Sequence, residues 1–198
     1  MGEIKDYKKE FTDAINIVHN ILTKLKIQYF LLSGTLLGAV RENDFIDHDY
    51  DIDIGFFYEE IATKIESLKE LLIENKFRLW GHFGKVDCGY TIQFIYKNRV
   101  RIDFVVIYKI SPDTGWYGLS VGEFKKYIMY KHIIPINDKI IEYKNFKPLM
   151  VTYIPENYDE LLKHEYGDYK IEKKESFGDF VNRHRLQGND QRVSFHSV

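Results

Sequence analysis

The stretch from residue 31 to residue 57 constrains the fold of this chain most, because it places Asp49, Asp51 and Asp53 at alternate positions. Successive side chains of a β-strand point to opposite faces, so the three carboxylates share one face while Ile52 points to the other. Neighbouring like charges repel, and the arrangement persists most readily when a cation neutralises it. Clustered carboxylate oxygens are ligands that Mg²⁺ prefers. The stretch therefore predicts a half-buried strand with a metal site on its polar face.

A second carboxylate, Asp103, stands inside another apolar strand-like run. An acid in a buried strand costs free energy unless it is paired or bound to a metal. If this strand lies beside the first, Asp103 completes a cluster with Asp51 and Asp53, as a third metal ligand or as a general base. Two hard cations held this way neutralise a phosphate and activate a hydroxyl for attack. The alternative for Asp103 is an ion pair with Arg99 or Arg101.

The short segment Ser33-Gly34-Thr35 follows an apolar strand and precedes a helix-like run. Glycine lets the backbone approach a ligand closely, and the amides at a helix N-terminus bind phosphate. An ordinary strand-to-helix turn has the same composition, so the segment gains weight only from the acids that follow it.

Hydrophobic periodicity and turn residues predict an α+β fold. Residues 1–170 are expected to form one catalytic domain, and residues 171–198 a polar, basic tail that includes Arg183 and Arg185. The expected elements are a helix over 4–26, a strand over 28–32, a short helical run over 36–41, the acidic strand over 49–56, a helix over 58–76, two or three strands within 77–109, a helix over 124–132 behind a Ser120-x-x-Glu123 capping box, a hairpin of 140–143 with 148–151, and a helix from Pro155 to about 165.

Composition excludes several classes of protein. The formal net charge of -2 does not favour non-specific binding to nucleic acid. The single cysteine fits a reducing compartment. No apolar run approaches the roughly 18 residues that span a bilayer, and the first residues are too charged for a secretory signal. We therefore expect a soluble, intracellular protein without a membrane span.

Several segments together resemble the LicD/fukutin family, a branch of the nucleotidyltransferase superfamily with a DNA-polymerase-β-like core. The matching segments are 34–41 (GTLLGAVR), 45–46 (FI), 49–55 (DYDIDIG), 102–104 (IDF), 154–162 (IPENYDELL) and 166–169 (YGDY). They extend over most of the chain. One departure is Asp47-His48, where the family commonly has Pro-Trp before the acids.

The resemblance implies transfer of a phosphorylated alcohol, such as phosphocholine or ribitol phosphate, from a CDP-activated donor to a glycan hydroxyl, with release of CMP. It implies that Asp51 and Asp53 hold Mg²⁺, or Mn²⁺, with Asp49 as a further ligand or orienting group and Asp103 as third ligand or base. Gly34, Thr35 and Arg41 are then expected to position the donor phosphates. Which acid acts as base stays open.

Three other hypotheses are compatible with the residues. One is a true nucleotidyltransferase that adds a nucleotide to a small molecule or protein, and another is a non-catalytic binding module of the same fold. The third is a calcium EF-hand loop, because Asp49, Asp51, Asp53 and Glu60 occupy its positions 1, 3, 5 and 12. Ile54 stands where that loop needs glycine, which argues against it.

Overall fold

The computed structural model describes residues 4, 7–121, 128–173, 178–180 and 190–193. Its elements are α1 (Lys8–Lys24), β1 (Phe30–Leu31), α2 (Ser33–Arg41), β2 (Asp51–Phe57), α3 (Tyr58–Ile61), α4 (Ile65–Glu74), β3 (Phe77–Lys85), β4 (Cys88–Tyr96), β5 (Val100–Ser111), β6 (Thr114–Val121), β7 (Ile128–Pro135), β8 (Ile140–Tyr143), β9 (Thr152–Pro155), α5 (Tyr158–Tyr166) and β10 (Asp190–Val193).

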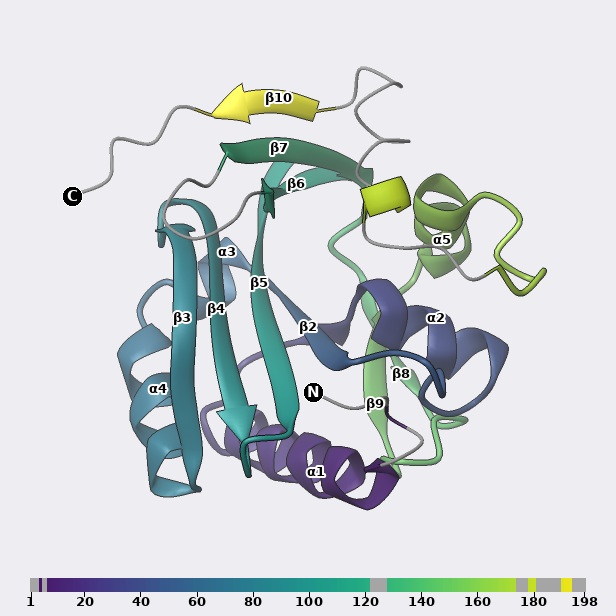
Figure 1. The fold of residues 1–198 in the computed structure, drawn as a ribbon. Coiled ribbons are helices and arrows are strands. Elements are labelled where there is room, and N and C mark those ends of the chain that lie inside the picture. Colours follow the sequence, from purple (N-terminus) through teal and green to yellow (C-terminus); the bar gives the residue numbers. More distant parts are fainter. Residues whose placement is uncertain (1–3, 5–6, 122–127, 174–177, 181–189, 194–198) are drawn as a thin grey trace.

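The long strand β5 organises an eight-stranded mixed sheet. Its first part lies between β2, which runs parallel to it, and β4, which runs antiparallel. Its last residues pair instead with β6, which continues the sheet through β7 to β10 (Figure 1). The parallel β2–β5 pair needs a long crossover connection, and the chain from α3 to β4 supplies it. The expected α+β fold, with helices around a mixed sheet, is confirmed.

The two faces of β2 and β5 differ in chemistry, as the alternation predicts. Ile52, Ile54, Phe104 and the other apolar residues of these strands are buried in one core with the apolar stripes of α1 and α4. Figure 1 shows α4 alongside β3 and α1 crossing below the ends of β4 and β5. Because one face of the strands is occupied by the core, the acids are confined to the other face.

Two glycines of the 34–55 stretch serve packing rather than chemistry. A Cβ atom on Gly38 would stand 2.6 Å from the carbonyl oxygen of Asp44, so the loop after α2 folds closely onto the helix only at glycine. A Cβ atom on Gly55 would stand 2.3 Å from the ring of Phe30. Gly38 therefore fixes the route from α2 toward β2, and Gly55 lets β2 pack against Phe30, its register partner on β1.

Some expected elements are wrong. The helix over 124–132 is not formed in its described part, because β7 begins at Ile128 and pairs with β6; residues 122–127 lie outside the described part of the chain. Strand β8 pairs with β9 over 152–155 rather than with 148–151. Pro155 ends β9, and α5 begins at Tyr158. The EF-hand hypothesis is also wrong, since residues 51–57 form an inner strand of the sheet.

Within the described ranges, no helix combines the length and the apolar character needed to cross a lipid bilayer.

Candidate active site

The carboxylates of Asp53 and Asp103 belong to residues that are direct register partners on the parallel strands β2 and β5. On the far side of β5, Gln93 of β4 is the register partner of Asp103. Its Nε2 donates a hydrogen bond of 2.8 Å to Asp103 Oδ2. The three side chains therefore form one polar row across the sheet, and the prediction that Asp103 joins the acidic strand on a neighbouring strand is confirmed.

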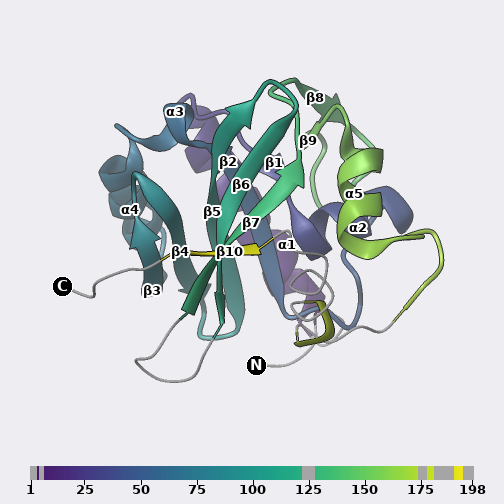
Figure 2. The ribbon, with the colours of Figure 1, turned by 90° about the horizontal axis from the view of Figure 1, so that it is seen from above.

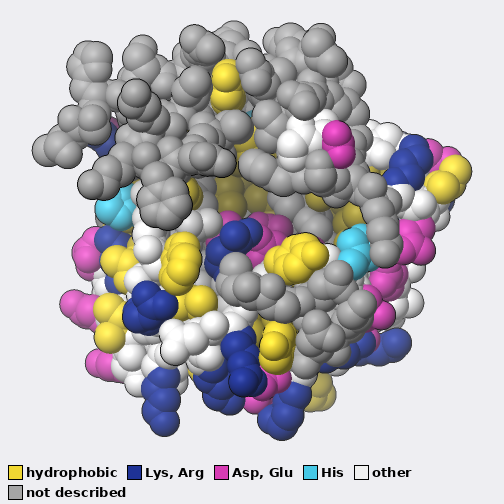
Figure 3. Space-filling model, in the orientation of Figure 1, with side chains coloured by type: hydrophobic (Ala, Val, Ile, Leu, Met, Phe, Trp, Pro, Cys, Tyr) yellow, Lys and Arg dark blue, Asp and Glu magenta, His cyan; other side chains and the backbone are white. Residues whose placement is uncertain are grey.

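Arg101 connects two of the acids. It is the register partner of Asp51, and its Nη2 forms an ion pair with Asp51 Oδ2. Its Nε lies 3.2 Å from Asp103 Oδ1, without the geometry of a hydrogen bond. Figure 3 shows acidic and basic side chains side by side near the middle of this face. The alternative that Asp103 pairs with Arg101 is therefore realised, and the described residues show Asp53 and Asp103 side by side without a three-carboxylate metal cluster.

The N-terminus of α2 rests directly on Asp53. Thr35 Oγ1 accepts a hydrogen bond of 2.9 Å from the Asp53 backbone N–H, and Thr35 is buried. The Gly34 backbone donates to the Asp53 carboxylate. The carboxylate of Asp49 packs against Gly34 so closely that a Cβ atom there would lie 2.3 Å from Asp49 Oδ2. Gly34 and Thr35 therefore position the acids, and their contact with donor phosphates stays a prediction.

Burial dominates the electrostatics of the three acids, and repulsion from neighbouring carboxylates adds to it at Asp53. Burial, and then the charges of Asp103, Asp49 and Glu165, raise the pKa of Asp53 well above its ordinary value. Burial raises the pKa of Asp49 as well. For Asp103 burial also raises the pKa, opposed by the Arg101 charge and the hydrogen bond from Gln93. Three carboxylates whose ionised forms are all disfavoured therefore belong to this site. Asp53 and Asp103 are on the sheet, whereas Asp49 precedes β2, which begins at Asp51 and not at residue 49 as expected.

This donor set fits a hard divalent cation. Carboxylate oxygens are its preferred ligands, and a cation offsets the repulsion that adds to burial in raising the pKa of Asp53. Asp103 Oδ1 also has no hydrogen-bond partner although it is buried. Among the described residues, however, no three His, Cys, Asp or Glu side chains already stand in a metal-binding arrangement. Arg101 holds Asp51 and Asp103 instead, so a cation would have to take its place.

Arg41 is not brought to the acids. It is the last residue of α2, whereas Gly34 and Thr35 are in the first turn. At about 1.5 Å per residue the helix separates the two ends by roughly 10 Å. The guanidinium is bound to Glu42, with Nη2 2.6 Å from Oε1. Its expected role toward donor phosphates stays a prediction that this geometry does not support.

A buried polar group that the sequence did not indicate lies beside the acids. Glu165 of α5 is fully buried, and Tyr117 of β6 donates a hydrogen bond of 3.2 Å to its Oε1. His132 of β7 is also fully buried, with Nε2 3.8 Å from the same oxygen. Helix α5 lies next to α2 in both ribbon views (Figures 1 and 2). The charge of Glu165 therefore reaches Asp53 from an element more than a hundred residues away in the chain.

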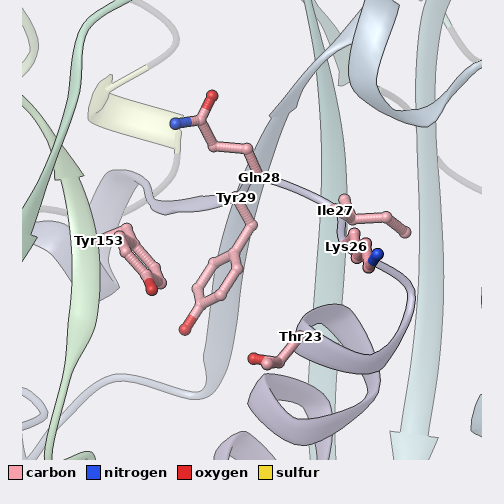
Figure 4. Close-up of a pocket in the computed structure, with 6 residues that line it drawn as sticks. All are labelled: Thr23, Lys26, Ile27, Gln28, Tyr29 and Tyr153. Carbon is pink, nitrogen blue, oxygen red and sulfur yellow. The ribbon is translucent and has the colours of Figure 1, made fainter.

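A separate surface pocket lies between the end of α1 and β9, lined by Thr23, Lys26, Ile27, Gln28, Tyr29 and Tyr153 (Figure 4). Tyr29 and Tyr153 meet edge to face with ring centres 5.4 Å apart, and the Tyr29 hydroxyl lies 2.7 Å from His19 Nδ1. These contacts tie α1 and β9 to β1. The pocket contains none of the carboxylates. The basic residues Arg183, His184 and Arg185 lie outside the described part of the chain.

Comparison with known proteins places the chain in a family. The family model described as "LicD/FKTN/FKRP, nucleotidyltransferase domain" matches residues 26–142, which include α2, β2, β4 and β5. This is more than half of the chain, and the chain therefore belongs to the LicD/FKTN/FKRP family.

Named relatives agree with that assignment. The chain is 25% identical over 166 residues to the ribitol-5-phosphate transferase FKTN of Macaca fascicularis, covering 81% of this chain and 35% of that protein. It is 24% identical over 168 residues to the human ribitol 5-phosphate transferase FKRP, covering 81% and 32%. An uncharacterized protein of Rickettsia prowazekii, RP689, is 39% identical over 170 residues, covering 77% and 63%. The chain thus spans about a third of the length of the two named transferases.

Proposed function

We propose that this chain is a Mg²⁺-dependent transferase that moves a phosphorylated alcohol from a CDP-activated donor to a glycan hydroxyl and releases CMP. The observation that carries the proposal is the facing pair Asp53 and Asp103, held on parallel strands beneath the N-terminus of α2. Family membership supports the transferase class, and the relatives named as ribitol-5-phosphate transferases favour ribitol phosphate as the transferred group.

The roles follow from the contacts. Asp51, Asp53 and Asp103 would hold the cation, which supplies charge neutralisation for the phosphates and lowers the pKa of a bound hydroxyl. Thr35 and Gly34 fix Asp53 through its backbone N–H and its carboxylate. Gln93 fixes Asp103 through Oδ2. Asp49, against Gly34, orients the first turn of α2.

In the reaction, the acceptor oxygen forms a bond to the alcohol-bearing phosphorus of the donor. The bond from that phosphorus to the oxygen of CMP breaks, and CMP leaves with the electron pair. The acceptor proton passes to a carboxylate of the site.

Product analysis tests the proposal. The protein is incubated with CDP-ribitol, CDP-choline or CDP-glycerol and a panel of sugar acceptors, with Mg²⁺ or with EDTA. We expect CMP and an acceptor that carries the phosphorylated alcohol, in the Mg²⁺ samples alone. Attachment of the nucleotide itself to the acceptor would contradict the proposal and favour a true nucleotidyltransferase. That is the second candidate, because the matched family domain is a nucleotidyltransferase domain. Absence of both turnover and Mg²⁺-dependent donor binding would favour a binding module.

A further inference from the structure

We propose that Arg101 is an exchangeable counter-charge: it neutralises Asp51 and Asp103 while the site lacks a cation, and it binds the donor phosphates once a cation has replaced it. This inference rests on the proposed function, since it assigns a donor-binding residue to the same site. It adds a residue for which the sequence suggested only a structural ion pair.

The contacts of Arg101 lie where a cation would bind. Its guanidinium bridges Asp51 on β2 and Asp103 on β5, through Nη2 and Nε respectively. The two acids are 15% and 14% exposed, and Arg101 itself is 31% exposed. A guanidinium stays charged at all working pH values, so it neutralises the acids at any of them while no cation is bound.

The contacts are also incomplete, which makes the guanidinium replaceable. Arg101 Nε and Asp103 Oδ1 are 3.2 Å apart, yet both are buried without a hydrogen-bond partner. An arginine with ideal fork geometry would make parallel hydrogen bonds to one carboxylate. Here the guanidinium contacts two different acids, and its Nε donor forms no hydrogen bond. A divalent cation would satisfy the same oxygens at shorter distances and with twice the charge.

Once released from the acids, the guanidinium stays close to them. Arg101 is the register partner of Asp51, so its Cα stays beside β2 whatever its side chain binds. A partly exposed guanidinium next to a cation site is suited to phosphate oxygens, which match its planar fork. No other Arg or Lys in the described part of the chain forms an ion pair with Asp51 or Asp103.

Three variants separate the two roles. Arg101→Met removes the charge, Arg101→Lys keeps the charge without the fork, and Arg99→Met is the matched control. Arg99 precedes β5, and its ion pair is with Glu10 at 3.1 Å rather than with Asp51 or Asp103. For each protein we would measure the melting temperature without metal, the Mn²⁺ dissociation constant by electron paramagnetic resonance, the CDP-ribitol dissociation constant with Mn²⁺ present, and CMP release.

Arg101→Met should change the two affinities in opposite directions. The metal-free melting temperature should fall by about 3 °C, because the acids lose their counter-charge. Mn²⁺ should bind about tenfold more tightly, since a competing positive charge is gone. CDP-ribitol should bind roughly tenfold more weakly or worse, because charged hydrogen bonds to phosphate are lost. Arg101→Lys should match the wild type in melting temperature and Mn²⁺ affinity and lose only part of the donor affinity.

The outcomes distinguish this inference from the proposed function. If Arg101→Met resembles Arg99→Met in both affinities while the wild type releases CMP, the inference is overturned and the proposed function stands. If the opposite shifts occur but no protein releases CMP, the inference stands and the proposed function is overturned. Failure of both the wild type and Arg101→Met to bind Mn²⁺ overturns the inference, and CMP release then decides the proposed function by itself.

Discussion

Asp53→Asn should reduce CMP release by roughly 10²-fold or more, while the metal-free protein becomes more stable. The loss follows from removing a full negative charge from the group that holds the cation and faces the reacting phosphate. The gain in stability follows from the environment of Asp53, whose ionised form is disfavoured by burial and by Asp103, Asp49 and Glu165. Asparagine keeps an oxygen that can accept the hydrogen bond from Gly34.

Asp51→Asn is the matched comparison, and it should reduce activity without the stabilisation. Alternation of the acids alone predicts that neutralising either residue relieves repulsion. The structure changes this expectation for Asp51, because its carboxylate is paired with Arg101. Breaking that partly exposed pair should lower the unfolding free energy by about 1 kcal/mol or less. Metal-free melting temperature and CMP release, measured for both variants, check the contrast. A lower melting temperature with retained activity for Asp53→Asn would favour a structural role.

The difference in stability between the wild type and Asp53→Asn should also depend on pH. Since the pKa of Asp53 is raised in the folded state, the folded protein takes up a proton at a higher pH than the unfolded chain. The unfolding free energy of the metal-free wild type therefore rises as the pH falls through that raised pKa toward the ordinary value near 4. Asp53→Asn should lose part of this rise. A pH series of melting temperatures for both proteins would show it.

Gly34→Ala should lower CMP release by roughly 10²-fold with little change in the melting temperature. The new methyl group would stand 2.3 Å from Asp49 Oδ2, so either this carboxylate or the first turn of α2 must move. The Gly34 hydrogen bond to Asp53 moves with it. A displacement of about 1 Å near reacting groups is enough for such a loss. Helical propensity gives alanine up to about 1 kcal/mol over glycine, which offsets the local cost in stability.

Gly81→Ala is the control for this substitution. Gly81 of β3 has no neighbour within 4 Å of an added Cβ atom, so the same chemical change meets open space. Its activity should equal that of the wild type. Equal activity of Gly34→Ala and Gly81→Ala would show that the α2 turn only connects β1 to β2.

The acidic strand could be predicted from sequence because its information is local. Alternation between Asp51, Ile52 and Asp53 assigns each side chain to a face before any partner strand is known. Asp103 was predictable for a related reason, since a carboxylate in an apolar strand needs a partner. The register that sets it opposite Asp53 confirms the reasoning.

The features that sequence did not predict depend on contacts between distant segments. Residues from Ile128 onward form β7 instead of the expected helix. Hydrogen bonding to β6 and β10 stabilises this strand more than a capping box stabilises a helix. Glu165 has the sequence context of an ordinary helix residue, and only the packing of α5 beside α2 brings its charge to Asp53. The contact of Arg101 with both Asp51 and Asp103 depends on the register between β2 and β5, which the alternation of side chains alone does not predict.

The proposed function requires the facing carboxylates of β2 and β5 to bind a divalent cation and the activated donor together. Calorimetric titration of CDP-ribitol into the wild type and into Asp103→Asn, each with Mg²⁺ and with EDTA, tests it most directly. The proposed function predicts donor binding by the wild type that requires Mg²⁺, and at least tenfold weaker binding by the folded Asp103→Asn variant. Donor binding of equal strength in both proteins, or in EDTA as in Mg²⁺, would contradict it.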